Sequence, residues 1–152
     1  MTTTTKWGMA LAAAIMMHMA AFAGDGTWIN TSGGAWPTTA NWSSGTMADG
    51  AGFLANFSTL DLSADATVTL DADRTIGHLV FDDTTPSHNW ILNTGSDGTL
   101  TLDVSADAST VEVHNCTATI GAVVSGTKDI VKSGSGTLAV ALPLIVGFTL
   151  GP

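Results

Sequence analysis

Positive charge is scarce in this sequence of 152 residues. Four Lys and Arg residues stand against 13 Asp and Glu residues, and charged residues make up only 11% of the chain. A nucleic-acid-binding surface needs a field of Lys and Arg to displace phosphate counterions, so the composition excludes a charge-driven nucleic-acid partner. Glutamine is absent and Glu112 is the only glutamate, which excludes a long exposed helix or a coiled coil.

Cysteine is almost absent as well. Cys116 is the only one, so no internal disulfide can form and a disulfide-stapled scaffold is excluded. His114 lies near it and would share its face on a strand, which is the pairing that an activated thiol needs. A small, half-buried strand residue is the alternative, and it is the interpretation that we adopt for Cys116.

The N-terminal residues 1–23 have the pattern of a secretory signal peptide. Lys6 is followed by an apolar run to Phe22, and Ala21 and Ala23 are the small residues that precede a cleavage site before Gly24. A transmembrane anchor is the alternative, but the run is shorter than the roughly 20 residues that a span requires. We therefore expect export through a cleavable signal peptide, to the cell surface or the extracellular space.

Residues 24–152, which follow the expected signal peptide, are rich in uncharged polar residues and divide into two parts. Residues 24–56 are dense in Gly, Ser, Thr and Asn and contain Trp28, Trp36 and Trp42, which predicts an N-terminal cap. From residue 57 the chain alternates β-branched or apolar residues with polar ones, which predicts strands separated by Asp-, Asn- and Gly-containing turns. The alternating segments lie at 67–70, 76–81, 99–104, 110–114 and 136–140.

These patterns predict an all-β protein, either a β-solenoid or a β-sandwich. Strands recur about every ten residues and have similar sequences, such as TVTLD at 67–71 and TLTLD at 99–103. In a solenoid, coils stack about 4.8 Å apart, so like residues form ladders in which Thr and Asn are tolerated and stacked charges are not. The low charge and high Thr content therefore favour a parallel β-helix with coils over 57–140, and the sandwich remains the alternative.

One segment resembles a known family. Residues 130–138, IVKSGSGTL, are similar to the core of the autotransporter-associated β-strand repeat, within one repeat at about 121–140. Upstream pieces such as GTW at 26–28, NW at 41–42 and TIGHLVF at 75–81 also resemble the leaders of such bacterial surface proteins. The resemblance implies a right-handed parallel β-helix of the passenger type, exported and displayed at the cell surface or outer membrane or released from it.

The resemblance also bears on the end of the chain and on its partners. Members usually carry many repeats, whereas one clear repeat is present, followed by the apolar tail ALPLIVGFTLGP at 141–152. We therefore expect an N-terminal fragment of a longer passenger, with a truncated coil in the tail. Partners would be surface glycans, neighbouring passenger repeats, or a second copy stacked end to end.

Four tryptophans are candidate glycan-binding residues. Trp28, Trp36, Trp42 and Trp90 could stack on the flat apolar faces of sugar rings, which predicts a glycan-binding module if the indoles are exposed. The alternative is that the tryptophans cover the open end of the solenoid, because an uncapped coil exposes its core and strand edges. We favour the cap.

Pairs of aspartates are the candidates for metal binding and catalysis. Asp71 with Asp73, and Asp82 with Asp83, could supply oxygen ligands to Ca²⁺, although Asp is also a common turn residue that bonds its own backbone. A polysaccharide-active enzyme would need such a pair set against Arg or Lys, and Arg74 is the only cation near in sequence. We expect turns rather than metal sites, no cofactor, no catalytic residue, and a non-catalytic structural or adhesive protein.

Overall fold

The computed structural model describes residues 23–141, 144–145 and 148–150, and only the backbone of those after residue 141. The signal peptide expected at 1–23 lies outside the described residues except for Ala23, and so does much of the tail at 141–152. Within the described part, no helix is long and apolar enough to cross a membrane.

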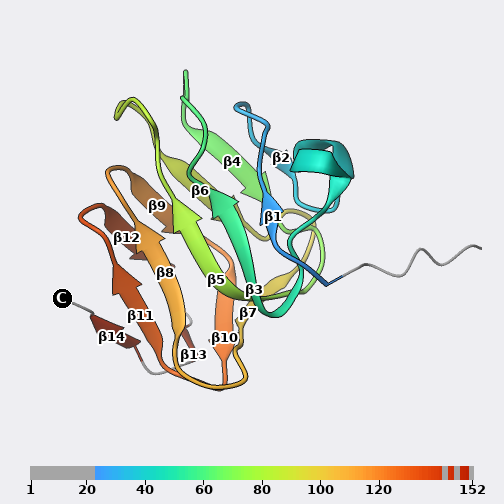
Figure 1. The fold of residues 1–152 in the computed structure, drawn as a ribbon, viewed down its shortest axis with the longest axis vertical. Helices are drawn as coiled ribbons and strands as arrows, with labels where there is room; N and C mark the ends of the chain where they lie inside the picture. The colour runs from blue at the N-terminus through green and yellow to red at the C-terminus, as the bar shows by residue number, and fades with distance from the viewer. Residues whose placement is uncertain (1–22, 142–143, 146–147, 151–152) are drawn as a thin grey trace, which may run out of the picture.

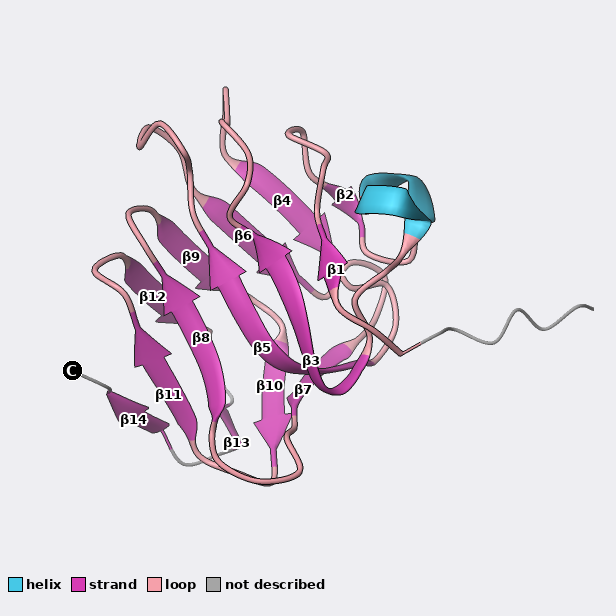
Figure 2. Cartoon of the chain, in the orientation of Figure 1, coloured by secondary structure: helices cyan, strands magenta, loops and turns pink. Residues whose placement is uncertain are grey.

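The described chain is all-β, and its only helical elements are the short 3-10 turns η1 (Thr39–Asn41) and η2 (Ser43–Gly45), both near the N-terminus (Figure 2). The strands, in chain order, are β1 (Gly26–Thr27), β2 (Gly34–Ala35), β3 (Gly50–Phe57), β4 (Ala66–Thr69), β5 (Arg74–Phe81), β6 (Trp90–Asn93), β7 (Thr99–Leu102), β8 (Ser109–Val113), β9 (Thr117–Ile120), β10 (Val123–Gly126), β11 (Ile130–Ser133), β12 (Thr137–Val140), β13 (Leu144–Ile145) and β14 (Phe148–Leu150).

The strands stack in successive coils to form a parallel β-solenoid, as predicted (Figure 1). One side is the ladder β2-β4-β6-β9-β12, a second is β7-β10-β13, and a third is β8-β11-β14. The long strand β5 joins the second and third sides, pairing with β7 through its first half and with β8 through its second half. All pairings between these strands are parallel, so the β-sandwich alternative, which requires antiparallel sheets, is wrong.

The corner inside β5 requires two glycines. Gly77 separates the half of β5 that pairs with β7 from the half that pairs with β8. A Cβ on Gly77 would lie 2.5 Å from the Cα of Gly52 in the adjoining strand β3, and Gly52 itself has φ +80°. The backbones of two successive coils therefore touch at this corner, where no side chain fits between them.

The core is a column of inward-facing apolar side chains. In β7 and β8 buried residues alternate with partly exposed ones, as the period-two pattern predicted, and β9 shows the same alternation. Phe57 of β3 and Phe81 of β5 are register partners whose rings stack 5.1 Å apart at an interplanar angle of 9°. Like side chains thus lie above one another from coil to coil.

The N-terminal region closes one end of this column. The segments carrying β1, β2, η1 and η2 lie at one end of the stack (Figure 1). An isolated antiparallel bridge joins Trp28 to Trp42 there. Strand β3 pairs with β5 over Leu54–Phe57 and so belongs to the solenoid itself. The boundary drawn at residue 56 from the sequence therefore falls inside a strand.

Candidate functional site

The four candidate glycan-binding tryptophans lie in the core. Trp28 and Trp36 are 0% exposed, and Trp42 and Trp90 are 1% exposed. All four rings lie within 5.7 Å of the Phe57 ring, centroid to centroid, so they form one aromatic cluster at the capped end. A sugar stacks on an exposed aromatic face, and this packing offers none. Trp28, Trp36 and Trp42 lie in the N-terminal cap, which was the alternative, and Trp90 lies in the solenoid strand β6 against the same cluster.

Each indole N–H is also satisfied inside the protein. A buried tryptophan needs a partner for its ring N–H, because an unpaired buried donor costs about 1–3 kcal/mol. The acceptors are all backbone carbonyls: Asn30 for Trp28 at 2.7 Å, Ala48 for Trp36 at 3.0 Å, Trp36 for Trp42 at 2.7 Å, and Asp82 for Trp90 at 2.8 Å. None of these four indoles therefore keeps a donor for a ligand.

Asp71 and Asp73, the first candidate metal pair, bind the next coil instead. Oδ1 of Asp71 accepts the amide N–H of Ser96 at 2.9 Å and its Oδ2 accepts the hydroxyl of Thr69 at 2.6 Å. Oδ1 of Asp73 accepts the amide N–H of Thr99 at 2.9 Å. The hydroxyl of Thr69 and then the Ser96 amide lower the pKa of Asp71, and the Thr99 hydroxyl and amide lower that of Asp73.

Asp83, of the second pair, is completely buried and has both carboxylate oxygens occupied. Oδ1 accepts the amide N–H of Leu62 at 2.9 Å, and Oδ2 accepts the amides of Ser87 at 3.0 Å and His88 at 2.9 Å. Burial alone would raise the pKa of Asp83, but these amide hydrogen bonds outweigh it and lower the pKa. Asp83 is thus an anion that holds loop 82–89 closed and joins it to loop 58–65.

The aspartates do not assemble into a metal centre. Among the described residues there is no group of three or more His, Cys, Asp or Glu side chains that could hold a metal ion. In both candidate pairs at least one carboxylate is committed to backbone amides of the same or the adjoining coil, which is the turn role that the sequence also allowed.

A small charged cluster was not anticipated from the sequence. Asp82 directly follows β5 and His114 directly follows β8, and the register pairs Phe81 with Val113 just before them. Nδ1 of His114 lies 3.8 Å from Oδ2 of Asp82, and its Nε2 lies 3.2 Å from Oε1 of Glu112. Strand register, which the sequence does not give, brings these three side chains together on one side of the solenoid.

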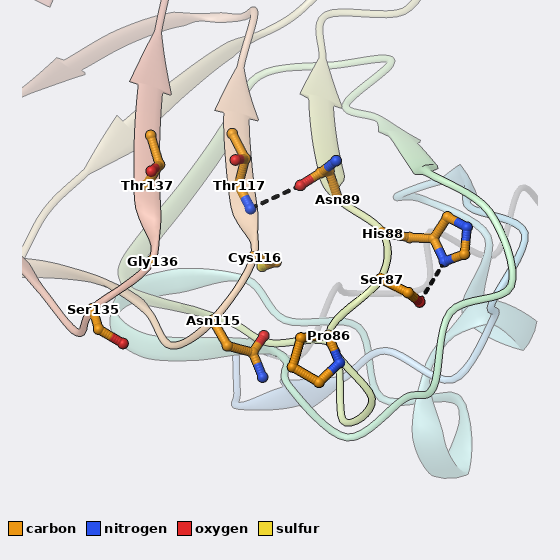
Figure 3. A pocket seen from close by; sticks show the side chains of 10 residues that line it. All are labelled: Pro86, Ser87, His88, Asn89, Asn115, Cys116, Thr117, Ser135, Gly136 and Thr137. Atoms are coloured by element: carbon orange, nitrogen blue, oxygen red, sulfur yellow. Dashed lines mark hydrogen bonds between the residues drawn. The ribbon is translucent and has the colours of Figure 1, made fainter.

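A groove of about 350 Å³ lies at the turns that lead into β6, β9 and β12 (Figure 3). In the coil of β5 and β6 this connection is the long loop 82–89, whereas in the next two coils it is the short turns 114–116 and 134–136. The long loop therefore stands above the short turns as a wall, and the short turns form the floor. Loop length, not strand sequence, produces the groove.

Hydrogen bonds hold the wall in place against the floor. Asn115 donates from Nδ2 to the carbonyl of Asp83 at 2.9 Å, and its Oδ1 accepts the Asp83 amide at 3.2 Å. At the start of the strands, Asp65 accepts the amide of Asn89 at 2.8 Å, and Asn89 in turn accepts the amide of Thr117 at 2.9 Å. The groove is therefore a built feature that spans several coils.

Cys116 lies at the floor of the groove but is a poor nucleophile. It is 7% exposed, and burial followed by the charges of Asp82 and Asp83 raises its pKa to about 11. A reactive cysteine requires a depressed pKa, because the thiolate is the nucleophile. The sequence predicted a small, half-buried strand residue here, whereas Cys116 is buried and lies in the turn 114–116 just before β9.

Comparisons with known proteins identify no relative: no family model, no curated protein and no solved structure matches the chain.

Proposed function

We propose that this chain is an exported, non-catalytic β-solenoid that serves a structural or adhesive role at the cell surface or outside the cell. The observation that carries the proposal is the use of the acidic side chains. The candidate catalytic carboxylate Asp83 is enclosed by amide donors, and Asp71 and Asp73 clamp one coil to the next. Side chains committed to the scaffold in this way suit a rigid rod more than an active site.

The proposal includes contact with further coils at the C-terminal end. Strand β12 pairs with β9 on one side, and no described strand covers its other edge. Its inward residues Leu138 and Val140 are only partly buried, whereas their partners Ala118 and Ile120 are each 1% exposed. An open strand edge above a partly covered core is a surface for neighbouring repeats or for a second copy stacked end to end.

Export can be tested with the full chain expressed in a bacterial host. We expect the exported protein to begin at Gly24, as read by the mass of the intact chain. Ala23→Arg should abolish cleavage because the peptidase reads a small residue there, whereas Phe22→Leu should be cleaved normally. A wild-type chain retained at full length inside the cell would contradict the proposal.

The structural role and the non-catalytic role have separate tests. Sedimentation of the mature chain over a range of concentrations should show self-association, and a strict monomer at every concentration would contradict end-to-end stacking.

The alternative of a polysaccharide-active enzyme is tested with a panel of polysaccharides. Turnover that is lost in Asp82→Ala and kept in Asp61→Ala, an exposed acid of loop 58–65, would replace the non-catalytic role with an enzymatic one.

A further inference from the structure

The groove beside loop 82–89 has the chemistry of a site for neutral, hydroxyl-rich ligands. None of its ten lining residues is Lys, Arg, Asp or Glu (Figure 3). The carboxylates of Asp65 and Asp83 are hydrogen-bonded to the lining residues Asn89 and His88, and this negative charge disfavours phosphate, sulfate and uronate ligands. What the lining offers instead is hydroxyl, amide and imidazole groups, from Ser87, His88, Asn89, Asn115, Thr117 and Thr137.

Three polar atoms of the groove keep hydrogen-bonding capacity for a ligand. The hydroxyls of Thr117 and Thr137 have no partner among the described residues, and both residues face outward from their strands. Nδ1 of His88 is engaged within the protein, 2.7 Å from the Ser87 hydroxyl and 3.0 Å from the carbonyl oxygen of Leu62. Nε2 of His88 has no partner among the described residues and is left for a ligand.

The arrangement of these groups repeats along the solenoid axis. Thr117 and Thr137 are direct partners in neighbouring strands, and Asn89 precedes them in the same ladder. Equivalent side chains are therefore about 4.8 Å apart, close to the length of one sugar ring in an extended chain. Two threonine hydroxyls at this spacing, with the Asn89 amide beside them, fit a ligand that also presents hydroxyls at a regular spacing.

An added peptide strand does not fit the floor of the groove. The amides of Gly136 and Thr137 already donate to the carbonyls of Val113 and Cys116, at 2.8 and 2.9 Å. The amide of Thr117 is bonded to Asn89. Recognition must therefore come from side chains, and a strand that binds through backbone hydrogen bonds has no free partners there.

From these observations we propose that the groove binds a neutral, linear polysaccharide whose chain runs along the solenoid axis, across the coils of β6, β9 and β12. The side-chain hydroxyls of Thr117 and Thr137 and Nε2 of His88 bind successive sugar units, and the wall formed by loop 82–89 orients the chain. This proposal names the class of ligand for the adhesive role proposed above, and its biological meaning rests on that role. Binding can nevertheless be measured on the purified protein, whether or not the protein is exported.

The test uses the mature chain and a panel of hexasaccharides followed by NMR titration. The neutral probes are β-1,4-glucan, β-1,3-glucan and β-1,4-mannan oligomers, and the anionic probe is oligogalacturonate. The test variants are Thr117→Val with Thr137→Val, and separately His88→Ala. The control is Thr119→Val, which removes an outward hydroxyl from the same strand β9, outside the groove, with the same change in shape.

At least one neutral oligomer should bind at millimolar concentration or below, with shifts confined to the groove. Each lost hydroxyl should weaken binding about fivefold, the usual effect of one net hydrogen bond, and Thr119→Val should leave it unchanged. Failure of every neutral probe would overturn the proposal. Equal weakening by Thr119→Val, or preference for oligogalacturonate, would overturn it as well. Export and self-association are measured in separate experiments. Failure of glycan binding would therefore not count against the proposed structural role.

Discussion

Replacing Asp83 by Asn should destabilise the solenoid by about 3 kcal/mol. The carboxamide is almost the same size and its oxygen can still accept the amide of Leu62, which lies in the core. Its NH2 group would replace Oδ2 and face the amides of Ser87 and His88, two donors for which the described residues offer no other acceptor. A hydrogen bond to a charged group contributes about 1.5–3 kcal/mol. Loop 82–89 is partly open to water, so we take about 1.5 kcal/mol for each of the two hydrogen bonds lost, those from Ser87 and His88.

The effect should depend on pH with a definite sign. The pKa of Asp83 is lower in the folded protein than the value of about 3.9 in an unfolded chain. Its contribution to the free energy of unfolding is therefore fully present above about pH 4 and disappears as the pH falls through the lowered folded value. The difference between wild type and Asp83→Asn should be constant from neutral pH down to about pH 5 and shrink below pH 4.

Urea unfolding followed by tryptophan fluorescence measures both effects, because the four core tryptophans report on the cap and on the coils. The matched control is Asp61→Asn, an exposed aspartate in loop 58–65 with no hydrogen bond of its own. We expect Asp61→Asn to change the free energy of unfolding by less than about 0.5 kcal/mol. A variant of Asp83 that is as stable as the control, or a difference that persists unchanged at pH 3, would refute the role assigned to Asp83.

Three further substitutions or reactions test the core, the thiol and the corner. Phe57→Ala should cost about 3–5 kcal/mol in urea unfolding because Phe57 is fully buried among aromatic rings, and Phe53→Ala, on the same strand but partly buried, should cost less. Iodoacetamide at pH 8 should label Cys116 on the order of 100-fold more slowly in the folded protein than in urea, because its pKa is raised to about 11, and equal rates would contradict this. Gly77→Ala should lower the thermal midpoint because its Cβ would meet backbone at 2.5 Å, whereas Gly24→Ala, whose nearest neighbour is 3.9 Å away, should not.

The strands with regular period-two alternation were predictable from the sequence, whereas the corner inside β5 was not. β7 and β8 alternate Thr or Glu with Leu or Val, so their inward faces could be read directly. β3 was assigned to the cap because its first half is rich in Gly, which is unfavourable in strands. Gly52 is nevertheless required there by the close approach of Gly77, a contact between coils that is invisible in the sequence.

The candidate sites were less predictable than the fold because they depend on register and burial. The tryptophans were recognisable as a group, but whether an indole stacks on a ligand or on Phe57 is decided by packing. The groove was missed because none of its residues forms a motif. The only sequence signal was a difference in spacing between strands, with loop 82–89 long and turns 114–116 and 134–136 short. That difference has meaning only after the coils are placed in register.

The scarcity of charge on the strands and the chemistry of the groove have the same physical origin. Two like charges 4.8 Å apart repel by about 0.9 kcal/mol even at the dielectric constant of water, and by more near a protein surface. A charged residue repeated on each coil of one ladder would add this repulsion at each step, so the ladder at the start of β9 and β12 carries Thr117 and Thr137 instead. Asp73 and Asp83 lie in turns instead, where amides of the adjoining coil donate hydrogen bonds to their carboxylates. This repulsion accounts for the uncharged hydroxyl and amide groups that line the groove across the stacked coils, and it is the reason that we propose a neutral polymer of sugars as its ligand.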